Sequence, residues 1–118
     1  MKIFFNDLLA VKNAFFYSLS GLKYLIKERA FRQEIILFFI IFFILIFIKL
    51  SVFMMLYIFS SYVLILITEA LNTALESVVN KVCPGFDEVA KKAKDVASAA
   101  VFIALAHFFI VLIVFCLF

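Results

Sequence analysis

The stretch Leu50–Glu76, LSVFMMLYIFSSYVLILITEALNTALE, decides the fold of this chain. Its first part, Leu50–Thr68, carries no charge and is long enough, as a helix rising ~1.5 Å per residue, to cross a ~30 Å hydrocarbon core. Its second part, Glu69–Glu76, places two carboxylates where that helix ends. The stretch therefore predicts a membrane-spanning helix that finishes in a polar face.

The composition around this stretch is that of a membrane protein with a single domain, residues 1–118. The chain has 118 residues, of which 69% are hydrophobic, and it contains eighteen Phe. Two further charge-free runs occur, Ile35–Ile48 and Val96–Phe118. The shorter run crosses a bilayer only if its flanking residues join the helix and Lys49 extends to the membrane surface. We predict an all-α membrane protein with spans at residues 29–49, 52–80 and 96–118.

Two more helices are predicted outside the spans. Residues 3–27 place apolar side chains at i, i+4, i+7 spacing on one face and basic or polar side chains on the other. A basic amphipathic helix of this kind lies along the membrane surface, although packing on a partner protein is the alternative. Residues 86–95 follow the helix-breaking Pro84-Gly85 pair and form a short charged helix that leads into the third span.

The distribution of Lys and Arg predicts the orientation. Ten of the eleven lie before Ile35 or between Asn80 and Asp95, and only Lys49 lies in the other connection. The positive-inside rule therefore places the amino terminus in the cytoplasm. The net charge of +3 suits anionic lipid and phosphates, while no basic-aromatic pattern points to nucleic acid. The two glycines are too few for a phosphate-binding loop of the P-loop or dinucleotide-binding kind.

The polar end of the second span is the candidate site. At about 100° per residue, five polar side chains share one helix face: Glu69, Asn72, Thr73, Glu76 and Asn80. Ionisable groups at such a position favour a function, although a polar seam between helices is the alternative. The charged segment Lys27–Glu34 lies at the same membrane level, so Glu28 or Glu34 could join Glu69 and Glu76 around a metal ion such as Mg²⁺. Carboxylates, Asn and Lys together meet the needs of phosphoryl transfer.

Three motifs in this chain resemble those of the prokaryotic diacylglycerol kinase family, which includes undecaprenol kinases. They are Ala30–Glu34 (AFRQE), Glu69–Glu76 (EALNTALE) and Ala93–Ala100 (AKDVASAA), and the similarity extends from about Tyr17 to the end. The resemblance implies a homotrimer in the bacterial inner membrane, with three-span subunits that each carry an amphipathic surface helix. It further implies transfer of the γ-phosphate of ATP to a lipid hydroxyl with Mg²⁺.

The resemblance also implies roles for individual residues. Glu69 would be the catalytic base on the lipid hydroxyl, Glu28 and Glu76 would hold the metal ion, and Asn72 would support that cluster. The nucleotide would contact Tyr17, Lys94 and Asp95 in addition to the metal-site residues. The lipid side would be lined by Phe31, Arg32, Gln33, Glu34 and Ser98, next to Glu69.

The chain departs from the family pattern at two places. Gly85-Phe86-Asp87 stands where the family usually has Glu-Tyr-His, and Ala10 stands where it has Arg, so a nucleotide contact at either place is open. Lys12 is a possible substitute for that Arg.

Three functions follow as alternatives. The Arg32–Glu34 run favours diacylglycerol as the lipid, whereas Gly21–Tyr24 is more typical of undecaprenol kinases. A small proton-coupled multidrug transporter is the alternative of another class, but it predicts a carboxylate near mid-span, and Glu69 and Glu76 are terminal.

Overall fold

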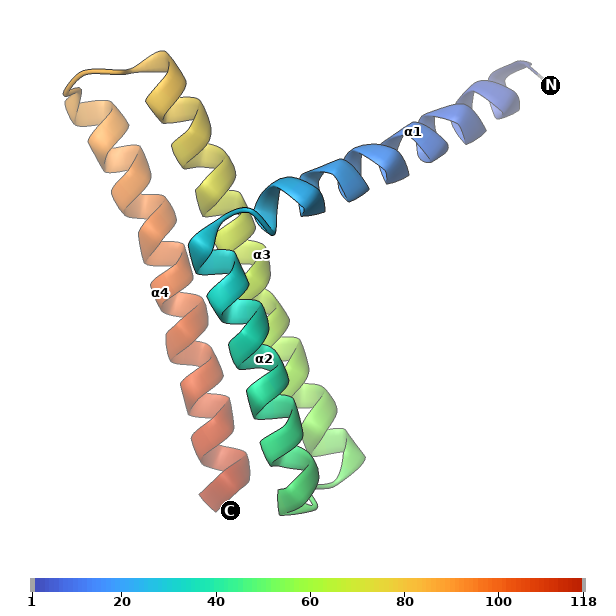
Figure 1. Cartoon of the computed structure of the whole chain (residues 1–118), viewed down its shortest axis with the longest axis vertical. Coiled ribbons are helices and arrows are strands. Elements are labelled where there is room, and N and C mark those ends of the chain that lie inside the picture. The colour runs from blue at the N-terminus through green and yellow to red at the C-terminus, as the bar shows by residue number, and fades with distance from the viewer. Residues whose placement is uncertain (1, 118) are drawn as a thin grey trace.

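The computed structural model describes the backbone of residues 2–117 and the side chains of residues 6–117, and all regular structure in this part is helical (Figure 1). The helices are α1 (Lys2–Leu25), α2 (Arg29–Ile48), α3 (Val52–Val82) and α4 (Glu88–Leu117). The predicted all-α class is confirmed. The first residue of the predicted domain and Phe118, the last of the third span, lie outside the described residues.

The predicted loop helix and third span form one continuous helix, α4. Asp87 starts it: its Oδ1 accepts a hydrogen bond of 2.7 Å from the backbone N–H of Ala90. Such a cap satisfies one of the amide groups that have no partner inside the helix. The charged first turns of α4 and its apolar part therefore share one helix axis.

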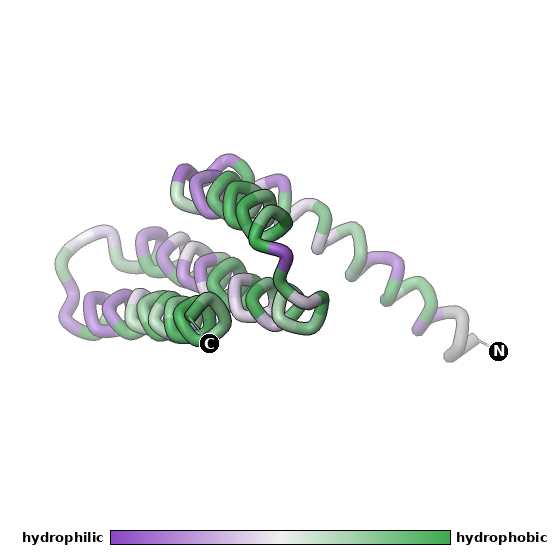
Figure 2. Tube along the Cα trace, turned by 90° about the horizontal axis from the view of Figure 1, so that it is seen from below, coloured by the Kyte–Doolittle hydropathy of each residue, from purple (hydrophilic) through white to green (hydrophobic). Residues whose placement is uncertain are grey.

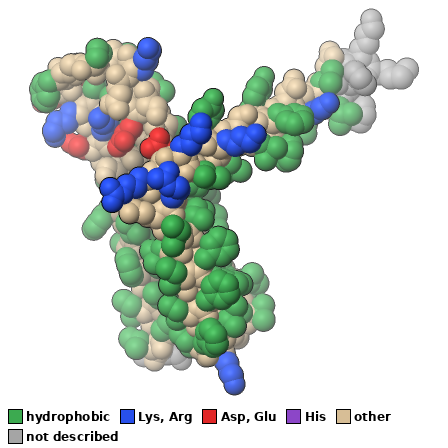
Figure 3. All heavy atoms as spheres, in the orientation of Figure 1, with side chains coloured by type: hydrophobic (Ala, Val, Ile, Leu, Met, Phe, Trp, Pro, Cys, Tyr) green, Lys and Arg blue, Asp and Glu red, His purple; other side chains and the backbone are tan. Residues whose placement is uncertain are grey.

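Three of the helices, α2, α3 and α4, are long and apolar enough to cross a membrane. Large apolar side chains lie on their outer surfaces, among them Phe47, which is 83% exposed, and Phe53, which is 75% exposed. In Figure 3 apolar side chains cover the lower part of the bundle, and Lys and Arg gather where α1 joins it and above. This distribution fits a bundle surrounded by acyl chains, with one charged end.

The bundle core lies along α3, which packs against α4 over much of its length and against α2. An aromatic series joins the three helices: the ring centroid of Tyr62 lies 5.3 Å from that of Phe38 and 5.1 Å from that of Phe108. Ring pairs at such separations add to the energy of burial. The buried cluster consists of Leu45, Ile58, Tyr62, Ile65, Ala104, Phe108 and Val111.

Helix α1 leaves the bundle at a wide angle (Figure 1), and hydrophilic and hydrophobic residues alternate along it (Figure 2). The corner between α1 and α2 is held by Arg32, whose Nη1 donates to the carbonyl oxygens of Ile26 (3.2 Å) and Lys27 (2.5 Å). Carbonyls at the end of a helix lack partners and carry partial negative charge, so a guanidinium stabilises them. The corner places Glu28 at the start of α2.

Candidate functional site: the polar face of α3

The acidic side chains of α3 lie on one face of the helix, as predicted. Asn72 Nδ2 donates to Glu76 Oε1 at 3.4 Å. The carboxylate of Glu69 lies close enough to that of Glu76 for the two negative charges to repel each other. All three side chains are partly buried. The face therefore combines two carboxylates and an amide in an environment that water reaches only in part.

Helix α2 adds a third carboxylate to this face. Tyr62 Oη donates a hydrogen bond of 2.8 Å to the backbone carbonyl of Glu34, which fixes the position of α2 along α3. The side chain of Glu34 is partly buried and lies within electrostatic range of Glu69. Acidic groups from two helices thus repel one another here, and such a cluster favours a bound cation or a shared proton.

Two oxygens of this face are buried and have no hydrogen-bond partner within the described residues: Glu34 Oε2 and Asn72 Oδ1. A buried polar atom without a partner costs free energy, and a ligand can supply the partner. Carboxylate and amide oxygens are the donors that Mg²⁺ prefers, so the donor set fits this ion. No group of three or more His, Cys, Asp or Glu side chains among the described residues converges on one point. Mg²⁺ accepts one or two carboxylates together with phosphate and water, so one chain needs no such group.

Glu28 lies in a groove of about 430 Å³ between α1 and α3. On the α3 side the groove is lined by small side chains, Ala70, Thr73, Ala74 and Ser77. Glu76, its predicted partner in metal binding, is not among the lining residues. Within one chain, Glu28 therefore faces the small-residue side of α3 next to the acidic face.

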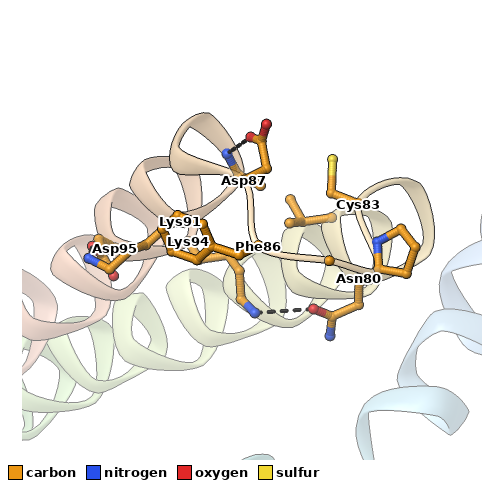
Figure 4. A pocket seen from close by; sticks show the side chains of 11 residues that line it. Asn80, Cys83, Phe86, Asp87, Lys91, Lys94 and Asp95 are labelled. Carbon is orange, nitrogen blue, oxygen red and sulfur yellow. Dashed lines mark hydrogen bonds and ion pairs between the residues drawn. The ribbon is translucent and has the colours of Figure 1, made fainter.

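A second cleft, of about 510 Å³, lies where the α3–α4 connection meets the two helices. Figure 4 shows Lys94 reaching from α4 to Asn80 on α3, and Lys94 Nζ donates to Asn80 Oδ1 at 3.1 Å. Lys91 Nζ and Asp95 Oδ2 form an ion pair of 2.8 Å along the same rim. Lys94 and Asp95, two of the predicted nucleotide contacts, thus line one cleft.

The residues that depart from the family pattern also line this cleft: Gly85, Phe86 and Asp87. One carboxylate oxygen of Asp87 already accepts the hydrogen bond that caps α4. The side chain of Phe86 is 88% exposed.

The other predicted site residues are dispersed. Tyr17 is 75% exposed on α1 and is not among the residues that line the cleft of Lys94 and Asp95. Gln33 and Ser98 are exposed, whereas Phe31 is buried, with 5% of its surface exposed. Arg32, predicted to line the lipid side, is engaged with the carbonyls of the α1–α2 corner.

Two further residues position the site, although the motifs assign them no role. Tyr62 lies seven residues before Glu69, on the same helix face, and that spacing is a signal that the sequence carries. Asn80 belongs to the predicted polar face, but its link to Lys94 joins two helices and is visible only in the structure.

The family described as prokaryotic diacylglycerol kinase matches residues 16–116 of this chain. Proteins named diacylglycerol kinase are similar to it: one from Sinorhizobium sp, 39% identical over 71% of this chain and 61% of the relative; one from Escherichia coli K12, 36% identical over 75% and 74%; and one from Haemophilus influenzae, 39% identical over 75% and 76%. The chain thus spans less than two thirds of the Sinorhizobium relative and about three quarters of the other two.

The family match covers α2 and α3 completely and α4 to its last residue but one. It includes the acidic face of α3, the α1–α2 corner and the cleft between α3 and α4. The family predicted from the motifs is therefore confirmed, and this chain belongs to the prokaryotic diacylglycerol kinase family.

Proposed function

We propose that this protein is an ATP-dependent diacylglycerol kinase, which transfers the γ-phosphate of ATP to the hydroxyl of diacylglycerol and yields phosphatidic acid. The observation that carries the proposal is the acidic face of α3, which lies where the apolar bundle gives way to Lys and Arg. A lipid hydroxyl and a water-soluble nucleotide can meet only at that level of the membrane. The names of the relatives support diacylglycerol as the lipid.

Glu69 is the proposed base. It is the first carboxylate after the apolar part of α3, so it is the one that a hydroxyl at the membrane surface reaches first. In the transfer, the hydroxyl oxygen attacks the γ-phosphorus, the bond to the bridging oxygen of ADP breaks, and Glu69 accepts the hydroxyl proton.

Glu28 and Glu76 are the proposed metal ligands, and Asn72 orients Glu76 through its hydrogen bond. Bound Mg²⁺ supplies neutralisation of the charge on the phosphates. Tyr17, Lys94 and Asp95 are the proposed nucleotide contacts. Phe31, Arg32, Gln33, Glu34 and Ser98 are the proposed lipid side of the site.

A homotrimer with shared sites completes the proposal. In one chain the groove of Glu28 and the cleft of Lys94 open on separate parts of a thin three-helix bundle. Helices of a neighbouring subunit packed on the small side chains Ala70 and Ala74 would bring further side chains to these openings. The bacterial inner membrane, with the amino terminus and the charged end in the cytoplasm, gives the site access to ATP.

The deciding experiment is a lipid-substrate assay. Purified protein in mixed micelles is given Mg-ATP with diacylglycerol or with undecaprenol, and the phosphorylated lipid is quantified. We expect phosphatidic acid from diacylglycerol. Phosphorylation of undecaprenol alone would assign the chain to the undecaprenol kinases of the same family. No lipid-dependent ATP turnover, together with proton-coupled export of cations, would point to the transporter.

A further inference from the structure

Asn80 is the last member of the polar face of α3, and the proposed transfer gives it no role. Its Oδ1 accepts a hydrogen bond of 3.1 Å from Lys94 Nζ, and the two residues lie fourteen positions apart, on different helices. Both line the cleft between α3 and α4 (Figure 4). Of the polar side chains of this face, Asn80 is the one that contacts a proposed nucleotide-binding residue on α4.

The lysines of this cleft differ in the partner that each has. Lys91 forms an ion pair with Asp95 one turn along the same helix, so its charge is compensated locally. Lys94 instead donates to a neutral amide, which holds the ammonium without compensating its charge. A phosphate is attracted to an uncompensated cation more strongly than to one already paired. Lys94 is thereby the cation of this cleft that remains available to the phosphates.

A lysine side chain has four rotatable carbon–carbon bonds, and ordering it on binding costs conformational entropy. A hydrogen bond in the unbound protein restricts the side chain beforehand and reduces that cost. The ammonium has three donors, so one can stay on Asn80 while the other two contact phosphate oxygens.

We propose that Asn80 is a positioning residue, which holds Lys94 across the cleft so that its ammonium meets the phosphates of the nucleotide. The inference rests on the proposed kinase function and extends it to the way in which ATP is bound. The property that matters is an uncharged acceptor oxygen at this place on α3, which holds the ammonium and leaves its charge to the phosphates.

The test compares Asn80→Leu, which removes the acceptor at nearly constant size, with Asn80→Gln, which keeps a neutral acceptor. For Asn80→Leu we expect the KM for ATP to rise about threefold to tenfold, the effect of one hydrogen bond, while kcat and the KM for lipid stay within about twofold. Asn80→Gln is expected to keep the KM for ATP within about twofold of the unchanged protein. An unchanged KM in Asn80→Leu, or an equal loss in Asn80→Gln, would overturn the proposal.

A double-mutant cycle separates positioning from a general effect on the fold. Binding of a fluorescent ATP analogue with Mg²⁺ is measured for Asn80→Leu, Lys94→Ala and the double variant. We expect Asn80→Leu to weaken binding only when Lys94 is present, because its effect passes through the ammonium. Additive losses would overturn the proposal. Lys92→Ala removes the same charge two residues earlier on α4 without removing the acceptor contact, and serves as the control for net charge.

Two further measurements distinguish a variant that fails to fold, and a failure of the proposed kinase function, from a failure of this inference. Thermal unfolding in detergent identifies a variant that fails to fold, and Asn80→Ala then replaces Asn80→Leu in the same cycle. If the unchanged protein binds the ATP analogue but phosphorylates no lipid, the proposed function fails while the cycle still decides the role of Asn80.

Discussion

Glu69 and Glu76 are the same residue type on one helix, seven positions apart, yet their surroundings differ. Glu76 accepts a hydrogen bond from Asn72, whereas Glu69 lies near the carboxylates of Glu34 and Glu76 and borders the apolar part of α3. A carboxylate fixed by an amide suits metal binding, and one next to other carboxylates suits proton transfer. Their replacement by Gln should therefore have different consequences.

Glu69→Gln removes the proposed base and keeps the size of the side chain. We expect kcat to fall by about 10² to 10⁴, the usual contribution of a general base, with Mg-ATP binding nearly unchanged. Phosphatidic acid formation and binding of an ATP analogue measure the two effects. Glu88→Gln, an equal change at an exposed place on the first turn of α4, is the control. Near-normal turnover in Glu69→Gln would exclude the base assignment.

Glu76→Gln removes a proposed metal ligand and the acceptor of the Asn72 amide. We expect the Mg²⁺ concentration for half-maximal activity and the KM for ATP both to rise about tenfold or more, since a charged ligand is lost. Titration of activity with Mg²⁺ at fixed ATP measures this. The assignment is wrong if the variant loses kcat while its Mg²⁺ dependence stays as before.

Among the elements, the corner between α1 and α2 depends on one side chain. Arg32 bonds to two carbonyls in the turn that follows α1, and this contact orients the segment that carries Glu28. A proposed lipid contact thus has a structural role as well, which the sequence motif did not indicate.

Arg32→Gln should loosen this corner. We expect backbone amides of residues 26–28 to exchange with deuterium about tenfold faster, because the charged hydrogen bonds that oppose local opening are lost. Hydrogen–deuterium exchange by mass spectrometry measures the change. Arg29→Gln removes an equal charge at the start of α2 and should leave these amides as they are. Equal exchange in both variants would show that Arg32 does not hold the corner.

The packing of α2 on α3 depends on Tyr62 in a similar way. Tyr62→Phe keeps the ring contacts with Phe38 and Phe108 and removes the hydrogen bond to the Glu34 carbonyl. We expect a loss of about 1 kcal/mol in the free energy of unfolding. Unfolding by sodium dodecyl sulfate in mixed micelles measures it. Tyr57→Phe, at a residue 47% exposed on the bundle surface, is the control, and an equal loss there would contradict the interpretation.

At the scale of the whole molecule, the shape of one chain bears on whether that chain can form the site alone. Helix α1 stands away from a narrow bundle, and the groove of Glu28 and the cleft of Lys94 open on separate parts of that bundle. Both features fit a site that is completed by a neighbouring subunit, as we propose.

Mixing of inactive subunits tests this arrangement. Glu69→Gln and Glu76→Gln chains, each inactive or weak alone, are unfolded together and refolded as mixed oligomers. If the two residues serve one site from different subunits, some mixed sites receive Glu69 and Glu76 together, and activity should return to a sizeable fraction of the unchanged enzyme. If both residues act from the same chain, each site keeps one defect and no activity returns, which would contradict sharing between these two residues.

The sequence by itself determined the helical class, the three spans and the acidic face of α3. Those features depend on local regularities: charge-free length sets a span, and a 3.6-residue period sets which side chains share a face. The shared face of Glu69, Asn72 and Glu76 therefore follows from their spacing alone.

Only the tertiary structure decided which residues of different helices meet. Glu34 approaches Glu69 because Tyr62 fixes α2 on α3, Lys94 reaches Asn80 because α4 is one continuous helix, and Arg32 turns back to the end of α1. Contacts of this kind depend on how far one helix is shifted and rotated against another. No periodicity within a single helix carries that information, because it arises from the packing of side chains between helices.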